Sequence, residues 1–267
     1  MNKLLISDLD GTLIEGGKFF TKEVIEAVER WKAAGNYFFI ATGRLISSAR
    51  YYADEIGCSD YVVSCSGACV YNEDKLVLSE EIDLEIPRKL WKICGDLGLY
   101  TQIYSGRKIY ANRHSEFTKY YEESCRKLPE KYKIPIEILP EIPDDFDEPV
   151  HKSSFIFKSQ EEKREVISSI SDFENVNKFE SLSALLDIIS CKSNKGKAGL
   201  WIKERLGAEE LFCIGDNEND IDMIKYADIG AAMGNAAYKV KKHADFIAPD
   251  ISDNGLINFI DYLLERE

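Results

Sequence analysis

Two carboxylates follow a short apolar segment near the start of the chain. Residues 3–7 read Lys-Leu-Leu-Ile-Ser, and Asp8-Leu9-Asp10-Gly11 comes directly after them. Neighbouring carboxylates repel each other and need a cation or a shared proton. The carboxyl end of a strand, beside a glycine, is also where open α/β sheets bind their ligands. Asp8 and Asp10 therefore favour, as a first hypothesis, a site for phosphoryl transfer.

Three further segments place polar residues beside apolar runs. They are Thr42-Gly43-Arg44, Lys195, and residues 215–220 with the sequence Gly-Asp-Asn-Glu-Asn-Asp. The carboxyl ends of parallel strands meet at one edge of a sheet, so we expect these segments to lie close to the carboxylate pair. Taken singly, each is more simply explained by a turn, a helix cap or an exposed surface position. Their joint order along the chain is what indicates a site.

Each residue type suits one part of a phosphoryl transfer. An ionised Asp8 at the strand end could attack phosphorus and form an aspartyl-phosphate. Asp10 could protonate the leaving alcohol and then activate a water molecule. Asp216, Asp8 and a backbone carbonyl near Asp10 would form a Mg²⁺ site, because this ion prefers oxygen ligands and keeps several waters.

Three more residues could hold the phosphate itself. Thr42 offers a hydroxyl, and the backbone N–H of Gly43 can approach a ligand closely. Lys195 offers a compact positive charge. It also precedes a predicted helix at 197–206, whose N-terminus attracts anions.

The elements that must position these residues alternate between strand and helix. Continuous apolar runs at 37–41, 61–64 and 211–214 predict buried parallel strands. Helical spacing of apolar residues predicts helices over 21–31 and 222–226, and Ser252 is predicted to begin a capped terminal helix. The expected fold class is α/β, with a Rossmann-like parallel-sheet core.

The middle of the chain has a different composition. Six of the seven prolines lie between positions 87 and 149. Helices are predicted over 86–97, 117–128 and 161–170, with a hairpin around 105–106 and a strand over 151–157. We expect residues 82–189 to form an inserted α+β domain, and residues 1–81 and 190–267 to form a discontinuous core.

Composition narrows the functional classes. The 267 residues carry a formal net charge of −13, which disfavours binding to nucleic acid or to anionic membranes. No apolar run approaches the roughly 18 residues that a membrane span needs. The seven scattered cysteines form no zinc-binding pattern. We expect a cytoplasmic protein, a monomer or weak homodimer, that acts on a small phosphorylated metabolite.

The motifs resemble those of the haloacid dehalogenase-like hydrolases. Residues 8–13 (Asp-Leu-Asp-Gly-Thr-Leu) are similar to the first signature of that family, and 41–44, 194–196 and 215–220 to the other three. Residues 214–224, followed by Ala-Met-Gly-Asn-Ala at 232–236, resemble the Cof-type, class IIB branch. The resemblance covers both ends of the chain, while the middle matches only in its position and its mix of helices and strands.

The resemblance implies a Rossmann-like core with a large α+β cap inserted between the second and third signatures. It implies a Mg²⁺-dependent phosphatase of small phosphorylated metabolites such as sugar phosphates. Asp8 would be the nucleophile, Asp10 the acid and base, and Asp216 a metal ligand, with Asn217 near the metal. Asp220 would orient Lys195 or a metal-bound water. The phosphate and substrate would be held by Leu9, Thr42, Gly43, Arg44, Lys195 and Asn219.

One position departs from the family pattern. The Cof branch usually has Asn-Gly-Ala after the third strand, whereas this chain has Ser66-Gly67-Ala68. The cap is expected to select the substrate because it closes over the site and excludes water. The candidates for reading the substrate are Arg44, Tyr104, Arg107, Arg113 and His114.

Two other functions use the same motifs. A phosphomutase or phosphotransferase would pass the aspartyl-phosphate to a sugar hydroxyl instead of water. A non-catalytic regulator that binds a phosphometabolite would normally lack Asp8 or Asp10, and both are present.

Overall fold

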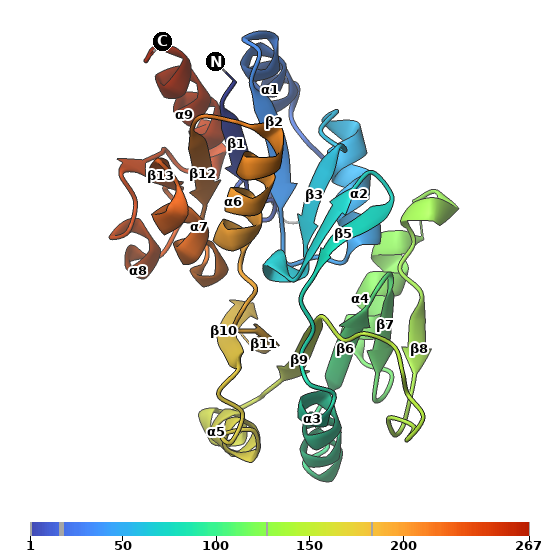
Figure 1. The fold of residues 1–267 in the computed structure, drawn as a ribbon. Coiled ribbons are helices and arrows are strands. Elements are labelled where there is room, and N and C mark those ends of the chain that lie inside the picture. Colours follow the sequence, from blue (N-terminus) through green and yellow to red (C-terminus); the bar gives the residue numbers. More distant parts are fainter. Residues whose placement is uncertain (1, 16–18, 127, 183, 267) are drawn as a thin grey trace.

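The chain folds around two β-sheets, one at each end of the molecule (Figure 1). The computed structural model describes residues 2–15, 19–126, 128–182 and 184–266. The larger sheet has eight strands in the order β14-β13-β12-β1-β2-β3-β4-β5, and the smaller has six in the order β10-β11-β9-β6-β7-β8. This arrangement confirms the α/β class.

The larger sheet, which we call the core sheet, is parallel from β14 to β3 and antiparallel from β3 to β5. The edge hairpin formed by β4 and β5 was not predicted, although β5 carries three consecutive apolar residues, most of which are exposed at the edge of the sheet. The strands are β1 (Leu4–Ser7), β2 (Tyr37–Ala41), β3 (Tyr61–Ser64), β4 (Cys69–Asn72), β5 (Lys75–Ser79), β12 (Leu211–Gly215), β13 (Ile229–Ala232) and β14 (Phe246–Ile247).

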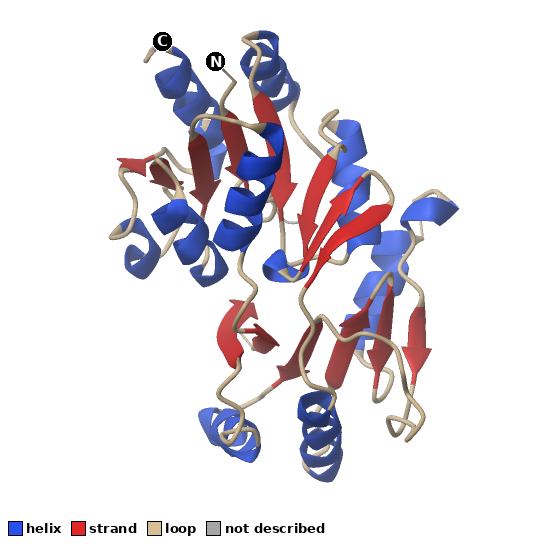
Figure 2. Cartoon of the chain, in the orientation of Figure 1, coloured by secondary structure: helices blue, strands red, loops and turns tan. Residues whose placement is uncertain are grey.

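Helices cover both faces of the core sheet, with α6 in front and α2 behind in the view of Figure 2. The sequence predicted that the terminal helix begins at Ser252, but in the structure it begins at Gly255. The reason is that Asp250 accepts from the Ser252 N–H in a separate 3₁₀ turn, and Asn254 then adopts a left-handed conformation. The helices are α1 (Lys22–Ala33), α2 (Ile46–Glu55), α6 (Lys195–Leu206), α7 (Ile221–Tyr226), α8 (Tyr238–Lys241) and α9 (Gly255–Leu264).

The smaller sheet and its helices form the part that we call the cap. The chain enters it after β5 and returns to the core at α6 (Figure 1). The strands are β6 (Thr101–Ser105), β7 (Lys108–Ala111), β8 (Ile136–Ile138), β9 (Lys152–Ile156), β10 (Val176–Leu182) and β11 (Leu185–Ser190). The helices are α3 (Glu85–Asp96), α4 (Glu116–Cys125) and α5 (Gln160–Ser169). The exact domain boundaries, at 81/82 and 189/190, stay a prediction.

The two faces of the cap sheet differ in polarity. Ile103, Phe155 and Ile188 are buried with apolar side chains of α3 and α5 in a hydrophobic cluster of the cap's own, on the side turned away from the core (Figure 1). The opposite face carries Tyr104, which belongs to the hydrophobic cluster of the core. The cap therefore has its own hydrophobic core and turns a different surface toward the core sheet.

Across the described residues, no helix is both long and apolar enough to cross a membrane.

Candidate active site

Three neighbouring strands bring the predicted residues to one edge of the core sheet. The order β12-β1-β2 places Ser7 opposite both Ile214 and Ile40. Asp8 follows β1, Asp216 follows β12, and the Thr42–Arg44 loop follows β2. Residues separated by more than 200 positions in the sequence are thus adjacent at the carboxyl ends of these strands, as the sequence predicted.

Lys195 lies at the centre of this edge. It is the first residue of α6 and is completely buried. Its ammonium donates to Asp8 Oδ1 and, over 2.7 Å, to Asp220 Oδ1. The side chain of Asn194 caps α6 by accepting from the Lys197 N–H at 2.7 Å. The helix start therefore fixes the ammonium between the two carboxylates.

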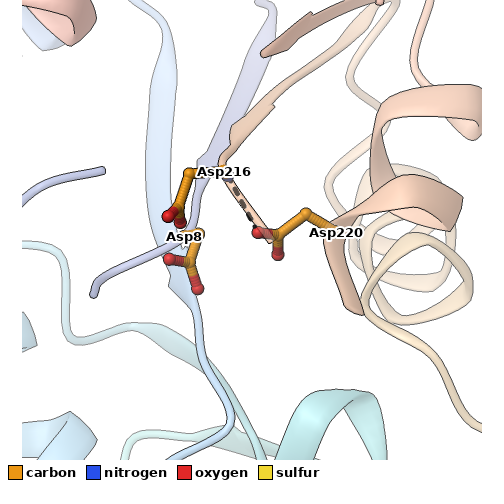
Figure 3. Close-up of side chains that lie close together, drawn as sticks. All are labelled: Asp8, Asp216 and Asp220. Atoms are coloured by element: carbon orange, nitrogen blue, oxygen red, sulfur yellow. Dashed lines mark hydrogen bonds between the residues drawn. The ribbon is translucent and has the colours of Figure 1, made fainter. Parts of the chain in front are cut away.

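Asp8, Asp216 and Asp220 form a compact acidic cluster. One carboxylate oxygen from each lies within 4.8 Å of the other two, and the side chains of Asp8 and Asp216 lie next to each other (Figure 3). Burial, reinforced by the charge of Asp220, raises the pKa of Asp8 well above its ordinary value. Burial and the same neighbour raise the pKa of Asp216 to about 7. The raised pKa values of Asp8 and Asp216 indicate that the nearby cations do not balance the negative charge of these two desolvated carboxylates.

The oxygens of Asp220 are already committed to protein donors. Oδ1 accepts from Lys195, and Oδ2 accepts from the backbone N–H groups of Asp216 and Asn217 at 3.0 and 2.9 Å. Asp220 thus contacts both Lys195 and the loop after β12, which is where a residue that orients Lys195 was predicted. Asp8 and Asp216 keep oxygens available for a metal ion.

The surroundings of Asp216 fit a divalent cation. The left-handed Gly11, with φ of 86°, leaves room for the Asp216 carboxylate in a space that a Cβ would occupy. Thr12 Oγ1 and Asn235 Nδ2 approach its two oxygens only at 3.4 Å. The edge holds four carboxylates, at positions 8, 10, 216 and 220, against the cations of Lys195 and Arg44. A divalent ion would neutralise this excess, and oxygen donors of this kind suit Mg²⁺.

Asp10 is paired with Arg44. The guanidinium donates to Asp10 Oδ1 at 2.6 Å and Oδ2 at 2.7 Å, and lies 4.9 Å from the ring centre of Tyr52. The Asp10 side chain is 48% exposed, in contrast to the buried Asp8. Asp10 therefore lies at the mouth of the site, where a leaving group or water can reach it.

The Thr42–Arg44 loop is braced by an unusual turn after β3. Thr42 Oγ1 accepts from the Arg44 N–H at 3.2 Å. The Ser66 N–H donates to the Thr42 carbonyl at 3.0 Å, from a left-handed conformation with φ of 57°. A Cβ on Gly43 would lie 3.2 Å from Ser66 Oγ and 3.7 Å from Asn219 Nδ2. The structure therefore places Gly43, Ser66 and Asn219 side by side.

Two other predicted site residues, Leu9 and Asn217, direct their side chains to other parts of the protein. The side chain of Leu9 is buried in the core, and its carbonyl accepts from the N–H groups of Leu13 and Ile14. Asn217 accepts from the Glu218 N–H and donates to the Ser181 carbonyl of the cap, so its side chain points away from the acidic cluster. The structure does not bring it to the metal position predicted for it.

The cap residues that were proposed to recognise the substrate also differ in how near they lie to the site. Tyr104 lies on the core-facing side of the cap sheet. Arg107 pairs with Asp74 in the turn between β4 and β5, away from the site, at 2.9 Å. Arg113 and His114 lie in the loop between β7 and α4, and within the described parts of the chain we find no hydrogen bond from either to a site residue.

Sequence reasoning missed three residues at this edge. Asn235, which donates to the Gly11 carbonyl at 2.8 Å, lies in the quoted Ala-Met-Gly-Asn-Ala motif and could have been found there. Lys152 and Asp187 of the cap reach the Gly43 loop as an ion pair. Both lie inside the predicted cap, and neither belongs to a motif that would have indicated a function.

Comparisons with known proteins agree with this geometry. The chain matches the haloacid dehalogenase-like hydrolase family over residues 5–260. It is 31% identical to YxeH of Bacillus subtilis over 274 aligned residues, which cover 99% of each chain. It is 24% identical to 5-amino-6-(5-phospho-D-ribitylamino)uracil phosphatase YcsE of the same organism, over 97% of this chain and 94% of that one.

Solved structures share the fold. The structure of the class IIB sugar phosphatase BT4131 superposes with a TM-score of 0.81 at 23% identity, over 98% of each chain. A haloacid dehalogenase-like hydrolase from B. subtilis gives a TM-score of 0.84 at 20% identity, over 98% of this chain and 99% of that one. With the match over nearly the whole sequence, these findings show that the chain belongs to the haloacid dehalogenase-like hydrolase family.

Proposed function

We propose that this protein is a Mg²⁺-dependent phosphatase that hydrolyses monoesters of small phosphorylated metabolites through an aspartyl-phosphate. The observation that carries the proposal is the buried Lys195 held between Asp8 and Asp220, with the Asp216 carboxylate beside Asp8. This arrangement brings an ammonium into contact with the carboxylate of Asp8. A phosphate group there would meet both a nucleophile and a cation.

In the first step, a carboxylate oxygen of Asp8 attacks phosphorus and the bond from phosphorus to the leaving oxygen breaks. The leaving oxygen takes a proton from the Asp10 carboxyl. Both oxygens of the Asp10 carboxyl accept hydrogen bonds from Arg44. We therefore infer that Arg44 must move away from Asp10 before this step, when the substrate enters.

In the second step, Asp10 takes a proton from water as the water oxygen attacks phosphorus. The bond between phosphorus and the Asp8 oxygen then breaks, which releases inorganic phosphate and restores the carboxylate. Here Asp10 acts as the base, with Arg44 as its hydrogen-bond donor. Lys195 holds the charge of the transferred group throughout.

Asp8, Asp216 and a backbone carbonyl near Asp10 would hold the magnesium ion. When bound, Mg²⁺ offsets the repulsion between the Asp8 carboxylate and an anionic phosphate. The names of two similar proteins, a sugar phosphatase and a phosphatase of a phosphoribityl compound, support a small phosphorylated metabolite as the substrate. We extend the proposal to a cytoplasmic location and a monomer or weak homodimer.

The test is to replace Asp8 with asparagine and measure inorganic phosphate released from a panel of phosphate monoesters. The variant keeps the size of the side chain but loses the nucleophile, so turnover should disappear while the fold is preserved. Asp145→Asn, at an exposed cap position, is the matched control and should keep full activity. Turnover that survives in Asp8→Asn would refute the covalent mechanism. Absence of phosphate release from every monoester, without an activating bisphosphate, would instead favour a mutase.

A further inference from the structure

A cavity of about 500 Å³ lies between the core and the cap. Its core wall includes residues of α2 and of the turn between β4 and β5, and its cap wall includes the turn between β6 and β7 and residues 131–132. Strand register pairs Tyr61, the first residue of β3, with Asn72, so the β4–β5 turn lies at the end of β3 away from the active-site edge. The cavity is therefore separate from the acidic cluster, and its volume suits a small organic ligand.

Arg50 of α2 lines this cavity and is only 8% exposed. One nitrogen of its guanidinium, Nη1, donates to the Ser59 carbonyl, but Nε and Nη2 have no hydrogen-bond partner among the described residues. Burial lowers the pKa of Arg50, even though the charges of Asp54 and Asp74 oppose that effect. A buried charge without a paired opposite charge is costly to the fold. The guanidinium therefore has unused capacity to bind an anion.

The two carboxylates whose charges act on this guanidinium are both paired with the cap. Asp54 Oδ2 accepts from Tyr132 Oη at 2.5 Å and from Lys131 Nζ at 3.3 Å. Asp74 Oδ1 accepts from Arg107 Nη2 at 2.9 Å. Neither carboxylate therefore satisfies Nε or Nη2 of the buried guanidinium.

Arg44 shows which group these two nitrogens can hold. Its Nε and Nη2 donate to the two carboxylate oxygens of Asp10 at 2.7 and 2.6 Å. The two N–H groups lie on one edge of the planar guanidinium, and their spacing matches the two oxygens of a carboxylate. In Arg50 the same two nitrogens are the ones without a partner. A carboxylate is therefore the group that fits them.

We propose that this cavity binds a small organic carboxylate, which accepts hydrogen bonds from Nε and Nη2 of Arg50 while Arg107 and Lys131 line its cap side. Nε and Nη2 are themselves closed to solvent, so a side chain of the wall shifts as the ligand enters. Arg107, whose side chain is 44% exposed, can make such a shift, and changes of this kind are common on binding. The ligand would contact both core and cap.

Glu73 limits the charge of the ligand. It lies in the β4–β5 turn, lines the cavity and is exposed, and none of the described residues forms an ion pair with it. With Asp54 and Asp74 it brings three carboxylates to a lining that has three cations. A dianion such as sulfate or phosphate would be repelled more strongly than a single carboxylate. The preferred ligand is therefore a monocarboxylate.

The test titrates the full-length protein with sodium benzoate, benzamide or sodium sulfate at constant ionic strength and measures Tm. Benzoate should raise Tm with a saturable dependence on concentration, because a ligand that binds only the folded state stabilises it. Benzamide has nearly the same shape without the charge and should give no shift. Sulfate should give a smaller shift than benzoate.

Variants place the binding in this cavity. Arg50→Lys keeps the positive charge but loses the planar pair of N–H groups, and should weaken benzoate binding by about tenfold or more. Glu73→Gln removes a repelling charge and should tighten benzoate binding about two- to fivefold. Glu165→Gln, at an exposed position of α5, is the matched control and should bind as wild type does. Asp8→Asn should also bind as wild type does, because Asp8 does not line the cavity.

Several results would overturn the proposal. They are no shift of the wild-type Tm with benzoate, equal shifts with benzoate and benzamide, a shift with sulfate that matches or exceeds that with benzoate, unchanged binding in Arg50→Lys, and loss of binding in Asp8→Asn. If Arg50→Lys does not fold, Glu73→Gln decides, and unchanged or weaker benzoate binding in that variant would refute the site. None of these measurements depends on phosphatase activity, so the proposed function and this site can fail separately.

Discussion

Replacing Asp216 with asparagine should stabilise the metal-free protein at pH 8 and remove its stabilisation by magnesium. The Asp216 carboxylate is partly buried, and this burial together with the charge of Asp220 raises its pKa from 3.8 to about 7. Its ionised form therefore destabilises the folded state when no cation is present. Asparagine keeps the shape of the side chain without the charge.

The magnitude follows from the change in pKa. Each unit corresponds to about 1.4 kcal/mol, so ionised Asp216 would destabilise the fold by about 4 kcal/mol at most. Relaxation and water penetration reduce such values, and about 2 kcal/mol is the expected effect. The folded state binds the proton more tightly than the unfolded chain. Protonated Asp216 therefore stabilises the folded state at low pH, and this stabilisation is lost as the pH rises from 3.8 to about 7.

The assay is urea unfolding at pH 8 and at pH 4, with and without Mg²⁺. Without the metal, Asp216→Asn should exceed wild type in unfolding free energy at pH 8 and approach it at pH 4. Mg²⁺ at 100 times its dissociation constant should stabilise wild type by about 2.7 kcal/mol and leave the variant nearly unchanged. Asp145→Asn, at an exposed position, should follow wild type throughout.

Two results would refute this reasoning. If metal-free Asp216→Asn were less stable than wild type at pH 8, the carboxylate would be satisfied by the protein alone. If Mg²⁺ stabilised both proteins equally, the ion would bind elsewhere.

Three further changes probe the positions of other buried groups. Lys195→Met leaves Asp8 and Asp220 without their shared cation, and should lower the unfolding free energy at pH 7 by about 3–5 kcal/mol; a smaller loss at pH 5 in urea unfolding would show that protonated carboxylates relieve it. His151 is buried and burial lowers its pKa below 6.5, so wild-type stability should fall as the pH drops below 6.5, and thermal unfolding of His151→Gln should depend less on pH; parallel profiles would contradict this. Gly67 has a φ of 95°, and a Cβ there would collide with the backbone at Asn194 and Lys195. Gly67→Ala should therefore lower Tm and activity together, at a cost of about 2 kcal/mol or more from the strained backbone and overpacking.

The core and its motifs were predictable because local sequence encodes them. The apolar runs at β1, β2 and β12 end at the residues that carry the chemistry, and parallel pairing leaves those ends at one edge. The start of α6 was predicted two residues late, because its first turn carries a lysine and a glycine in place of an apolar stripe.

Contacts that depend on packing between distant parts of the chain were not predictable. Arg44 was expected to meet the substrate, yet it pairs with Asp10, and this pairing depends on how the loops after β1 and β2 approach each other. Lys152 and Asp187 lie in strands whose neighbours are apolar on one face and polar on the other. Nothing in their spacing indicates that this polar face meets the loop at Gly43, because that contact depends on the placement of the cap.

Ser66 shows why a departure from the family motif has physical content. Both Cys65 and Ser66 adopt left-handed conformations, with φ of 49° and 57°, at a cost on the order of 1–3 kcal/mol each. Asparagine tolerates this region better than serine, so the backbone alone gives no reason for serine here. The difference lies in the side chain: the short hydroxyl ends beside Gly43 and has no hydrogen-bond partner among the described residues, whereas asparagine would place a longer amide there. Because the strained turn is fastened to Thr42 and Arg44 by two backbone hydrogen bonds of 3.0 Å, it holds that small hydroxyl in a fixed place. Serine at this position therefore places a small polar group beside the Gly43 loop, although its backbone conformation is less favourable for serine than for asparagine.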